Sequence, residues 1–175
     1  MVIRPLDKSD ERNDFSSGDE DLDRFFRRFA GQNQFKHHLA ITYIAVDEKR
    51  TPRIAGFATI AAGHIDTDDL PPELARRWPQ YPLPVMRLGR LAVDHRSQGR
   101  GIGSELLAFL FERAWRMADH VGCVGLVVDA KPSAVAFYAR FGFRPVAAPL
   151  EGQAQSRPEP TMMFLPLASI ARAGR

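Results

Sequence analysis

The chain has 175 residues, a length that suits one compact domain, and 45% of them are hydrophobic, which supports a core without disulfides. Its single cysteine, Cys123, excludes an internal disulfide and a zinc site built from several cysteines; its place in an apolar run predicts a buried filler. The net charge is +3 and all but four of the 24 basic residues are arginine, so the composition permits a phosphorylated cofactor, a nucleic acid or an ordinary solvated surface.

The start of the chain carries charged residues instead of the apolar region of a signal peptide. No segment reaches the ~20 apolar residues that a membrane span needs. The sequence therefore predicts a soluble cytoplasmic protein without a membrane partner.

The first half of the chain is predicted to hold a strand, an amphipathic helix and a strand pair. In the helix, apolar residues recur at three- and four-residue spacing, and acids precede arginines as the helix macrodipole favours. The two later runs have β-rich composition and flank a polar turn, a pattern typical of a hairpin. The elements expected are a strand over Val2–Leu6, a helix from a cap at Ser17 or Asp19 to about Gln34, strands over Ala40–Asp47 and Ile54–His64, and a turn over 48–52.

The second half is predicted to alternate helices with strands and to end in an antiparallel pair. One of its strands is a continuous apolar run, which is typical of a strand buried on both faces. The elements expected are a short helix within Pro71–Trp78, an extended connection through Pro79, Pro82 and Pro84, a strand over Met86–Val93, a helix from about Gly103 to Asp119, a strand over Cys123–Asp129, a helix over Ser133–Phe141, and strands over Phe143–Ala147 and Thr161–Leu165 separated by a polar loop over Pro149–Pro160.

A glycine-rich turn, Gln98–Gly103, connects a predicted strand to a predicted helix. Its three glycines stand at alternating positions, so the backbone can adopt positive φ and come close to a ligand. Several N–H groups can then point at one anion, supported by the helix N-terminus. Arg96 and Arg100 flank the turn and can add charged hydrogen bonds. The pattern predicts a pyrophosphate-binding turn.

Three families of phosphate-binding turn could explain this pattern. A P-loop requires a lysine after its last glycine, and no lysine follows Gly103. A dinucleotide-binding fold requires G-x-G-x-x-G near a first strand, whereas this turn lies past mid-chain with a different spacing. The third family is the GNAT superfamily of acetyltransferases. Gln98–Gly103 resembles its Q/R-x-x-G-x-G/A signature, in the same strand–turn–helix context.

A second segment, Ala136–Phe143, resembles the aromatic segment of the same superfamily. Phe137, Phe141 and Phe143 are interpreted as core residues. By resemblance, the hydroxyl of Tyr138 lies near the thioester sulfur of acetyl-CoA, where it could protonate the departing thiolate. The alternative is that Tyr138 is a structural residue.

The resemblance implies a single GNAT acetyltransferase domain over 1–175, of the α/β (α+β) class. Its expected fold is a mixed central sheet of about six to seven strands with a V-shaped splay, flanked by about four helices. The chemistry it implies is direct attack of an amine on bound acetyl-CoA, with no metal and no acetyl-enzyme. The cofactor-binding residues that it implies are Leu91, Ala92, Val93, Arg96, Gln98, Gly99, Arg100, Gly101, Ile102, Gly103 and Ser104.

Two further segments, Phe15–Phe26 and Tyr81–Val93, resemble GNAT toxins of bacterial toxin–antitoxin pairs. Ser17-Gly18 departs from the Cys-Gly that this group usually has, and the serine could still cap the helix. The group acetylates the α-amino group of aminoacyl-tRNA. The resemblance thus implies three macromolecular partners: an aminoacyl-tRNA, a small DNA-binding antitoxin and a second copy of the chain in a homodimer. A GNAT enzyme acting on a small amine or peptide N-terminus, and a non-catalytic acetyl-CoA-binding module, are the alternatives.

An α-amino group has a pKa near ~8, so it needs little help from a general base. Glu105 and Glu112 are expected to be solvated, and His64 and His95 to be loop or edge residues. Binding of tRNA calls for cations that neutralise phosphates. Two basic groups are candidates: Arg24, Arg27, Arg28, Lys36, His37 and His38 near the end of the first helix, and the preferred set, Arg76, Arg77, Arg87 and Arg90.

Overall fold

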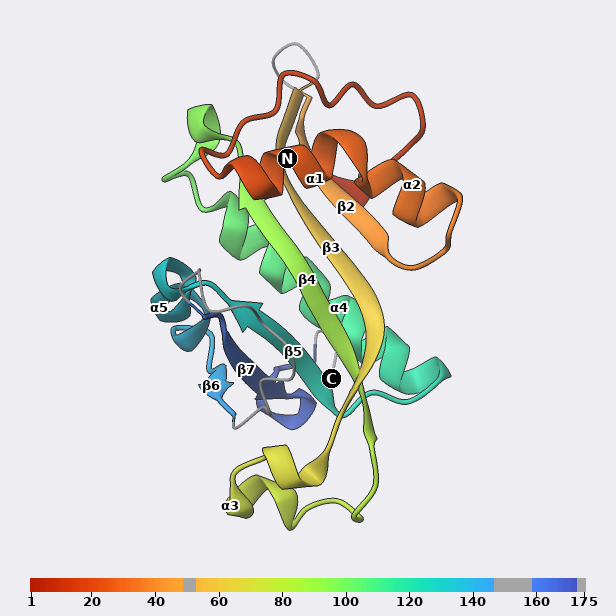
Figure 1. Ribbon diagram of the computed structural model, residues 1–175, viewed down its shortest axis with the longest axis vertical. Coiled ribbons are helices and arrows are strands. Elements are labelled where there is room, and N and C mark those ends of the chain that lie inside the picture. The colour runs from red at the N-terminus through yellow and green to blue at the C-terminus, as the bar shows by residue number, and fades with distance from the viewer. Residues whose placement is uncertain (49–52, 147–158, 173–175) are drawn as a thin grey trace. The chain divides into compact units, whose positions relative to one another are not determined.

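The structure is a computed structural model that describes residues 1–48, 53–146 and 159–172. Figure 1 shows the course of the chain through the described helices and strands. These elements are β1 (Val2–Pro5), α1 (Glu20–Arg28), α2 (Ala30–Phe35), β2 (Ile41–Asp47), β3 (Arg53–Ile65), α3 (Pro72–Ala75), β4 (Leu83–Val93), α4 (Ile102–His120), β5 (Gly125–Ala130), α5 (Val135–Ala139), β6 (Arg144–Pro145) and β7 (Thr161–Pro166).

Seven strands form one sheet in the order β1-β2-β3-β4-β5-β7-β6. The pairs β1–β2, β2–β3, β5–β7 and β6–β7 are antiparallel. The mixed sheet of six to seven strands and the closing antiparallel pair are therefore confirmed. The residues group into two compact units, unit 1 (1–61 and 88–113) and unit 2 (62–87 and 114–175), and the long strands β3 and β4 contribute to both.

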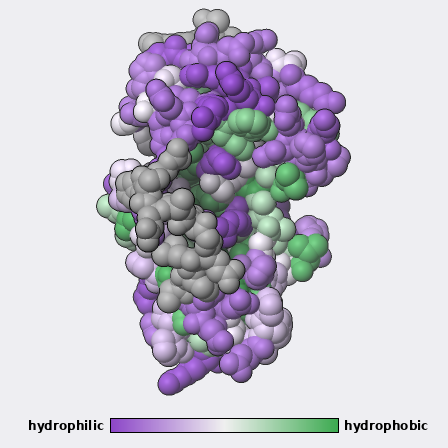
Figure 2. Space-filling view, in the orientation of Figure 1, coloured by the Kyte–Doolittle hydropathy of each residue, from purple (hydrophilic) through white to green (hydrophobic). Residues whose placement is uncertain are grey.

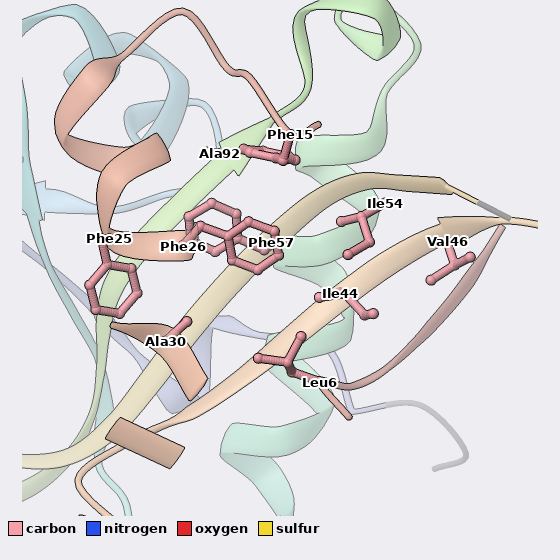
Figure 3. Close-up of a cluster of buried hydrophobic side chains, with 10 residues drawn as sticks. All are labelled: Leu6, Phe15, Phe25, Phe26, Ala30, Ile44, Val46, Ile54, Phe57 and Ala92. Atoms are coloured by element: carbon pink, nitrogen blue, oxygen red, sulfur yellow. The ribbon is translucent and has the colours of Figure 1, made fainter. Parts of the chain in front are cut away.

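In unit 1, side chains alternate between the two faces of β2 and β3. One face carries Ile44 opposite Phe57, and these residues pack with Phe26 of α1 in a buried cluster (Figure 3). The rings of Phe26 and Phe57 are stacked with centroids 4.2 Å apart, and Phe15 meets both rings edge-on. The three aromatic rings fix α1 and the preceding loop to the sheet.

The opposite face of these strands packs against the first turns of α4. Gly56 lies there, and a Cβ at this position would be 3.0 Å from the carbonyl oxygen of Ala92 and 3.1 Å from side-chain atoms of Ile102 and Leu106. A side chain here would be tighter than most Cβ contacts, so its neighbours would have to move by a few tenths of an ångström. The close contact places the start of α4 directly beside the end of β4.

The predicted first helix is two helices. The Asp19 side chain caps α1 by accepting from the N–H groups of Asp21 and Leu22, which selects Asp19 over Ser17 as the cap. The helix ends at Arg28, and Phe29 joins it to α2 with φ −111°. Figure 2 shows a mostly hydrophilic surface over α1 and α2, where acids occupy the first turn of α1 and arginines its last turn.

The core of unit 2 lies on the face of the sheet that carries Val127 and Phe164, which are paired across β5 and β7. Leu74 of α3 and Leu83 of β4 pack in the same cluster, and the Trp78 ring meets Phe164 edge-on. A Cβ at Gly125 would be 2.3 Å from the carbonyl oxygen of Leu165, so this position requires glycine. The burial of Leu126, Val127 and Val128 confirms a strand buried on both faces.

The start of β4 differs from the prediction. We expected Pro84 in an extended connection and the strand to begin at Met86, but β4 begins at Leu83. A proline lacks only the N–H, and the carbonyl of Pro84 accepts a hydrogen bond from the N–H of Val124 at 2.8 Å. One acceptor is therefore enough to hold this proline in the strand.

Cys123 precedes β5 and is buried, as expected. Its Sγ donates to the carbonyl oxygen of Gly125 at 3.2 Å, and burial raises the pKa of the thiol. The turn over 49–52 and most of the loop Pro149–Pro160 lie outside the described residues. Within the described part of the chain, no helix combines the length and the apolar character that crossing a membrane would require.

Candidate functional site

The glycine-rich turn in unit 1 has the backbone geometry of an anion-binding site. Gly99 and Gly101 have φ of +74° and +81°, and an added Cβ at either position would meet no atom of the described residues within 4 Å. Helix α4 begins at Ile102, whose buried side chain fixes the helix to the core. Within the described residues, no hydrogen bond occupies the N–H groups of Gln98–Gly103. Free amides, open space and a helix N-terminus together can hold a pyrophosphate.

A buried carboxylate, Asp94, holds the loop that leads into this turn. Asp94 is 0% exposed and caps the short helical turn over 95–97. Arg53 donates to Oδ1 of Asp94 at 2.6 Å, and Arg96 donates to both carboxylate oxygens at 2.9 Å. The N–H of Ser16 donates to the same carboxylate at 3.2 Å. Asp94 thus joins β3, β4 and the loop before α1.

The side chains of Arg96, Gln98 and Arg100 also hold this loop. The Gln98 amide donates to the carbonyls of Ser17 at 2.9 Å and Val93 at 3.1 Å. Arg96 donates to the carbonyl of Asp14 at 2.7 Å in addition to Asp94, and Arg100 pairs with Asp47 at 3.2 Å. The structure therefore gives these three side chains scaffolding contacts and leaves the backbone amides for an anion.

We expect Asp94→Ala to lower the free energy of unfolding by about 2–3 kcal/mol, because it leaves two arginines and the backbone N–H groups of Ser16 and Arg96 without their acceptor. Chemical denaturation measures the change. Asp129→Ala is the matched control: Asp129 is 41% exposed and pairs with a half-exposed Arg87, so its loss should cost less than about 1 kcal/mol. Equal losses in the two variants would contradict the anchoring role of Asp94.

The predicted pantetheine-binding residues Leu91, Ala92 and Val93 form the end of β4, directly before Asp94. Ala92 is buried, whereas Leu91 and Val93 are half-buried. The carbonyl of Val93 accepts from Gln98, which ties the end of the strand to the glycine turn. Their binding to the cofactor stays a prediction.

Tyr138 lies in α5 of unit 2 and is only 5% exposed. The rings of Phe137 and Phe143 lie edge-on to it, with centroids 5.2 Å and 5.4 Å away. Within the described residues its hydroxyl has no hydrogen-bond partner, and burial raises its pKa above the ordinary value. The phenol therefore keeps its proton at neutral pH and can donate it to a bound group.

The structure does not bring the four preferred arginines into one unit. Arg76 and Arg77 are exposed beyond α3, and Arg87 forms an ion pair with Asp129, all in unit 2. Arg90 belongs to unit 1, where its guanidinium lies 3.7 Å from the centroid of the Phe25 ring and desolvation lowers its pKa. A shared tRNA contact by these residues stays a prediction.

Sequence reasoning missed two buried carboxylates, Asp94 and Asp23. Asp23 accepts from the backbone N–H of Ser17 at 2.8 Å and from its hydroxyl at 2.6 Å. The Ser17 hydroxyl also accepts from the N–H of Asp19 at 3.2 Å, so Ser17 supports the start of α1 without being its cap. For Asp94, the available signal was an aspartate between a strand and a turn, a common capping position.

Residues that we set aside as bases are exposed: Glu105, Glu112, His64 and His95 all lie on the surface of their units. His95 contacts the carbonyl of Ser16 through Nδ1 at 2.9 Å, which makes it part of the same loop. The described residues contain no group of three or more His, Cys, Asp or Glu side chains that could hold a metal ion.

Comparison with known proteins agrees with this geometry. Residues 18–154 match the model of the acetyltransferase (GNAT) domain family. A tRNA-acetylating toxin from Mycobacterium tuberculosis strain H37Rv is 36% identical over 141 residues, which are 80% of this chain and 82% of the relative.

Two solved structures are also similar over nearly their whole length. AtaT in complex with acetyl-methionyl-tRNAfMet has a TM-score of 0.80 and 25% identity, covering 96% of this chain and 95% of that one. AtaTR bound with acetyl-CoA has a TM-score of 0.74 and 26% identity, covering 96% and 94%. The family match, the toxin relative and the shared fold lead to one conclusion: the chain belongs to the GNAT acetyltransferase family.

Proposed function

We propose that this protein is an acetyl-CoA-dependent N-acetyltransferase that acetylates the α-amino group of an aminoacyl-tRNA and acts as the toxin of a toxin–antitoxin pair. Acetyl-CoA as the donor is supported by the turn Gln98–Gly103, whose backbone amides are free within the described residues and which contains two positive-φ glycines. The acceptor is supported by the 36% identity to a tRNA-acetylating toxin. As in the sequence interpretation, one domain over 1–175 would carry out the reaction in the cytoplasm.

Acetyl-CoA supplies a thioester, from which an amine can take the acetyl group with release of the thiol. The free backbone amides of Gln98–Gly103 would hold the pyrophosphate, with Arg96 and Arg100 securing the loop. The N–H of Ser104, which was also expected to bind it, instead donates to the carbonyl of Gly101 at 3.0 Å. The backbone of Leu91–Val93 would bind the pantetheine arm as an added strand. These contacts orient the donor and need no change in the protonation of the protein.

Proton transfer needs an acid for the sulfur and no strong base for the amine. An α-amino group with a pKa near ~8 is partly neutral at cellular pH, so it can attack the carbonyl directly. The Oη–H of Tyr138 would give its proton to the departing sulfur, and the proton lost by the amine would return the phenol to its neutral form. Both protons are then accounted for at the end of the cycle.

Control of a toxin requires a partner that binds it. AtaT has been solved with the C-terminus of its antitoxin AtaR, and KacTA has been solved with DNA. By analogy, a small DNA-binding antitoxin would hold this protein inactive. A homodimer remains a prediction from the resemblance.

The acceptor is tested by incubating the purified protein with acetyl-CoA and a set of aminoacyl-tRNAs. We expect N-acetylated aminoacyl-tRNA, detected by mass spectrometry of the released adduct, and growth arrest when the protein is expressed in bacteria. Free amino acids and short peptides serve as competing substrates. Acetylation of these amines with none on tRNA would assign the protein to the small-amine enzymes of the family instead.

A further inference from the structure

A second concave site in unit 1 lies outside the predicted cofactor residues. A pocket of about 370 Å³ is lined by the loop after β1, the last turn of α1 and one face of α2. Its lining residues are Lys8, Arg12, Arg28, Gly31, Gln32 and Phe35. Three of the six are cations and none is an acid.

The three cations of this pocket have no carboxylate partner within the described residues. Neither Lys8, Arg12 nor Arg28 forms an ion pair there, and the Nε of Arg12 is buried without an acceptor. Asp10, which lies two residues from both Lys8 and Arg12 in sequence, is engaged by both terminal nitrogens of Arg4 at 2.8 Å and 2.7 Å. This carboxylate forms its ion pair with Arg4 and not with Lys8 or Arg12, although the nearby charge of Arg12 helps to lower its pKa.

The neighbouring arginines of α1 behave differently. Arg24 pairs with Asp21 at 2.8 Å, and Arg27 donates to the carbonyl of Phe15 and lies 3.9 Å from Asp23. Within the part of the chain that the structure describes, the other arginines of this helix are thus paired, whereas Arg28 at the pocket has no ion-pair partner. The ammonium group of Lys8 lies over the ring of Phe35, 5.6 Å from its centroid, a weak cation–π contact that favours its position beside the pocket.

We propose that the pocket of Lys8, Arg12 and Arg28 binds a backbone phosphate of the tRNA that carries the substrate amino acid. The inference rests on the proposed function. An arginine fork can bind two oxygens of one phosphate, and the Gln32 amide can donate to a third. The contacts carry no base information, so they would position any tRNA on the protein and leave selection of the aminoacyl group to the reaction centre.

Position 31 offers a sharp test of charge in the pocket. A Cβ at Gly31 would lie 3.5 Å from the Nη2 of Arg12 and 3.8 Å from Phe35, which is ordinary contact distance, so a side chain fits there. Gly31→Glu would place a carboxylate beside the guanidinium, and Gly31→Gln would place a neutral group of the same size. We expect Gly31→Glu to weaken the binding of deacylated tRNA at least tenfold at about 0.1 M salt. We expect Gly31→Gln to weaken it much less.

A second pair of variants removes a cation instead of adding an acid. Arg28→Gln should weaken tRNA binding about tenfold and make the slope of log affinity against log salt less steep by about one. Arg24→Gln is the matched control, because Arg24 lies on the same helix and already pairs with Asp21, and its slope should stay unchanged. Affinity for acetyl-CoA, measured by calorimetry, should be equal in all four variants and the parent.

The outcomes distinguish failure of the pocket proposal from failure of the proposed function. If the parent acetylates aminoacyl-tRNA while Gly31→Glu and Arg28→Gln bind deacylated tRNA as tightly as their controls, the pocket proposal is wrong and the function stands. If the parent neither binds nor acetylates tRNA, both proposals fall. A loss of acetyl-CoA affinity in Gly31→Glu would also overturn the proposal, since it would show a general structural effect.

Discussion

Tyr138→Phe should lower kcat by about 100-fold or more and leave the affinity for acetyl-CoA nearly unchanged. The hydroxyl is the only group lost, and within the described residues it supports no hydrogen bond of the fold. The phenylalanine ring can keep the edge-on contacts with Phe137 and Phe143. Loss of the hydroxyl therefore removes a proton donor without creating a cavity or an unpaired group.

Steady-state acetylation of an aminoacyl-tRNA measures kcat, and calorimetry with acetyl-CoA measures affinity. Tyr43→Phe is the matched control, because Tyr43 is also buried, at 8% exposed, and contacts the Phe109 ring edge-on in unit 1. It should retain full activity. Parental turnover in Tyr138→Phe would remove Tyr138 from the mechanism and return it to a structural role. Expression of Tyr138→Phe in bacteria should also relieve the growth arrest.

The glycine turn was predictable from sequence because its information is local. Positive φ at Gly99 and Gly101 follows from glycines at alternating positions between a strand and a helix. The cap at Asp19 and the apolar face of α1 are likewise determined by residues that are close in sequence. Such features depend on a few consecutive residues, so they can be predicted without knowledge of tertiary contacts.

The anchor of the same turn was not predictable, because its partners are remote. Arg53 and Ser16 lie 41 and 78 residues from Asp94 in sequence, and nothing in a single sequence pairs them. Arg96 was expected to bind the cofactor, since an arginine beside a phosphate-binding turn is the usual donor. The buried carboxylate of Asp94 engages its guanidinium, a contact that only the folded structure shows, and binding of Arg96 to the cofactor stays a prediction.

Two boundaries of the predicted elements differ from the structure. The helix break at Phe29 follows no proline, and apolar residues continue the three- and four-residue spacing through it. The strand that includes Pro84 depends on a hydrogen bond from Val124, some 40 residues later in the chain. A tertiary contact therefore decided the strand boundary against the local pattern, whereas the side chain of Phe29 at the helix break is 44% exposed.

Gly101→Val should abolish detectable binding of acetyl-CoA, with a loss of affinity of at least about 100-fold. The substitution has two separate effects on the turn. A β-branched residue at φ +81° is strained by about 1–3 kcal/mol, so the turn would relax away from its present conformation. The new side chain would also stand in the open space beside the free amides, where the pyrophosphate is expected.

Gly122→Val separates the two effects. Gly122 has φ +98°, so valine is strained there as well, but a Cβ would meet only Pro84, at 3.7 Å, and the position is not part of the turn. Chemical denaturation should show similar losses of stability in the two variants, whereas calorimetry should show lost acetyl-CoA binding only in Gly101→Val. Retained affinity in a folded Gly101→Val protein would mean that the amides of Gln98–Gly103 do not hold the pyrophosphate. Equal loss of binding in both variants would mean that strain anywhere in the chain is enough to disable the site, and that the turn has no special part in binding.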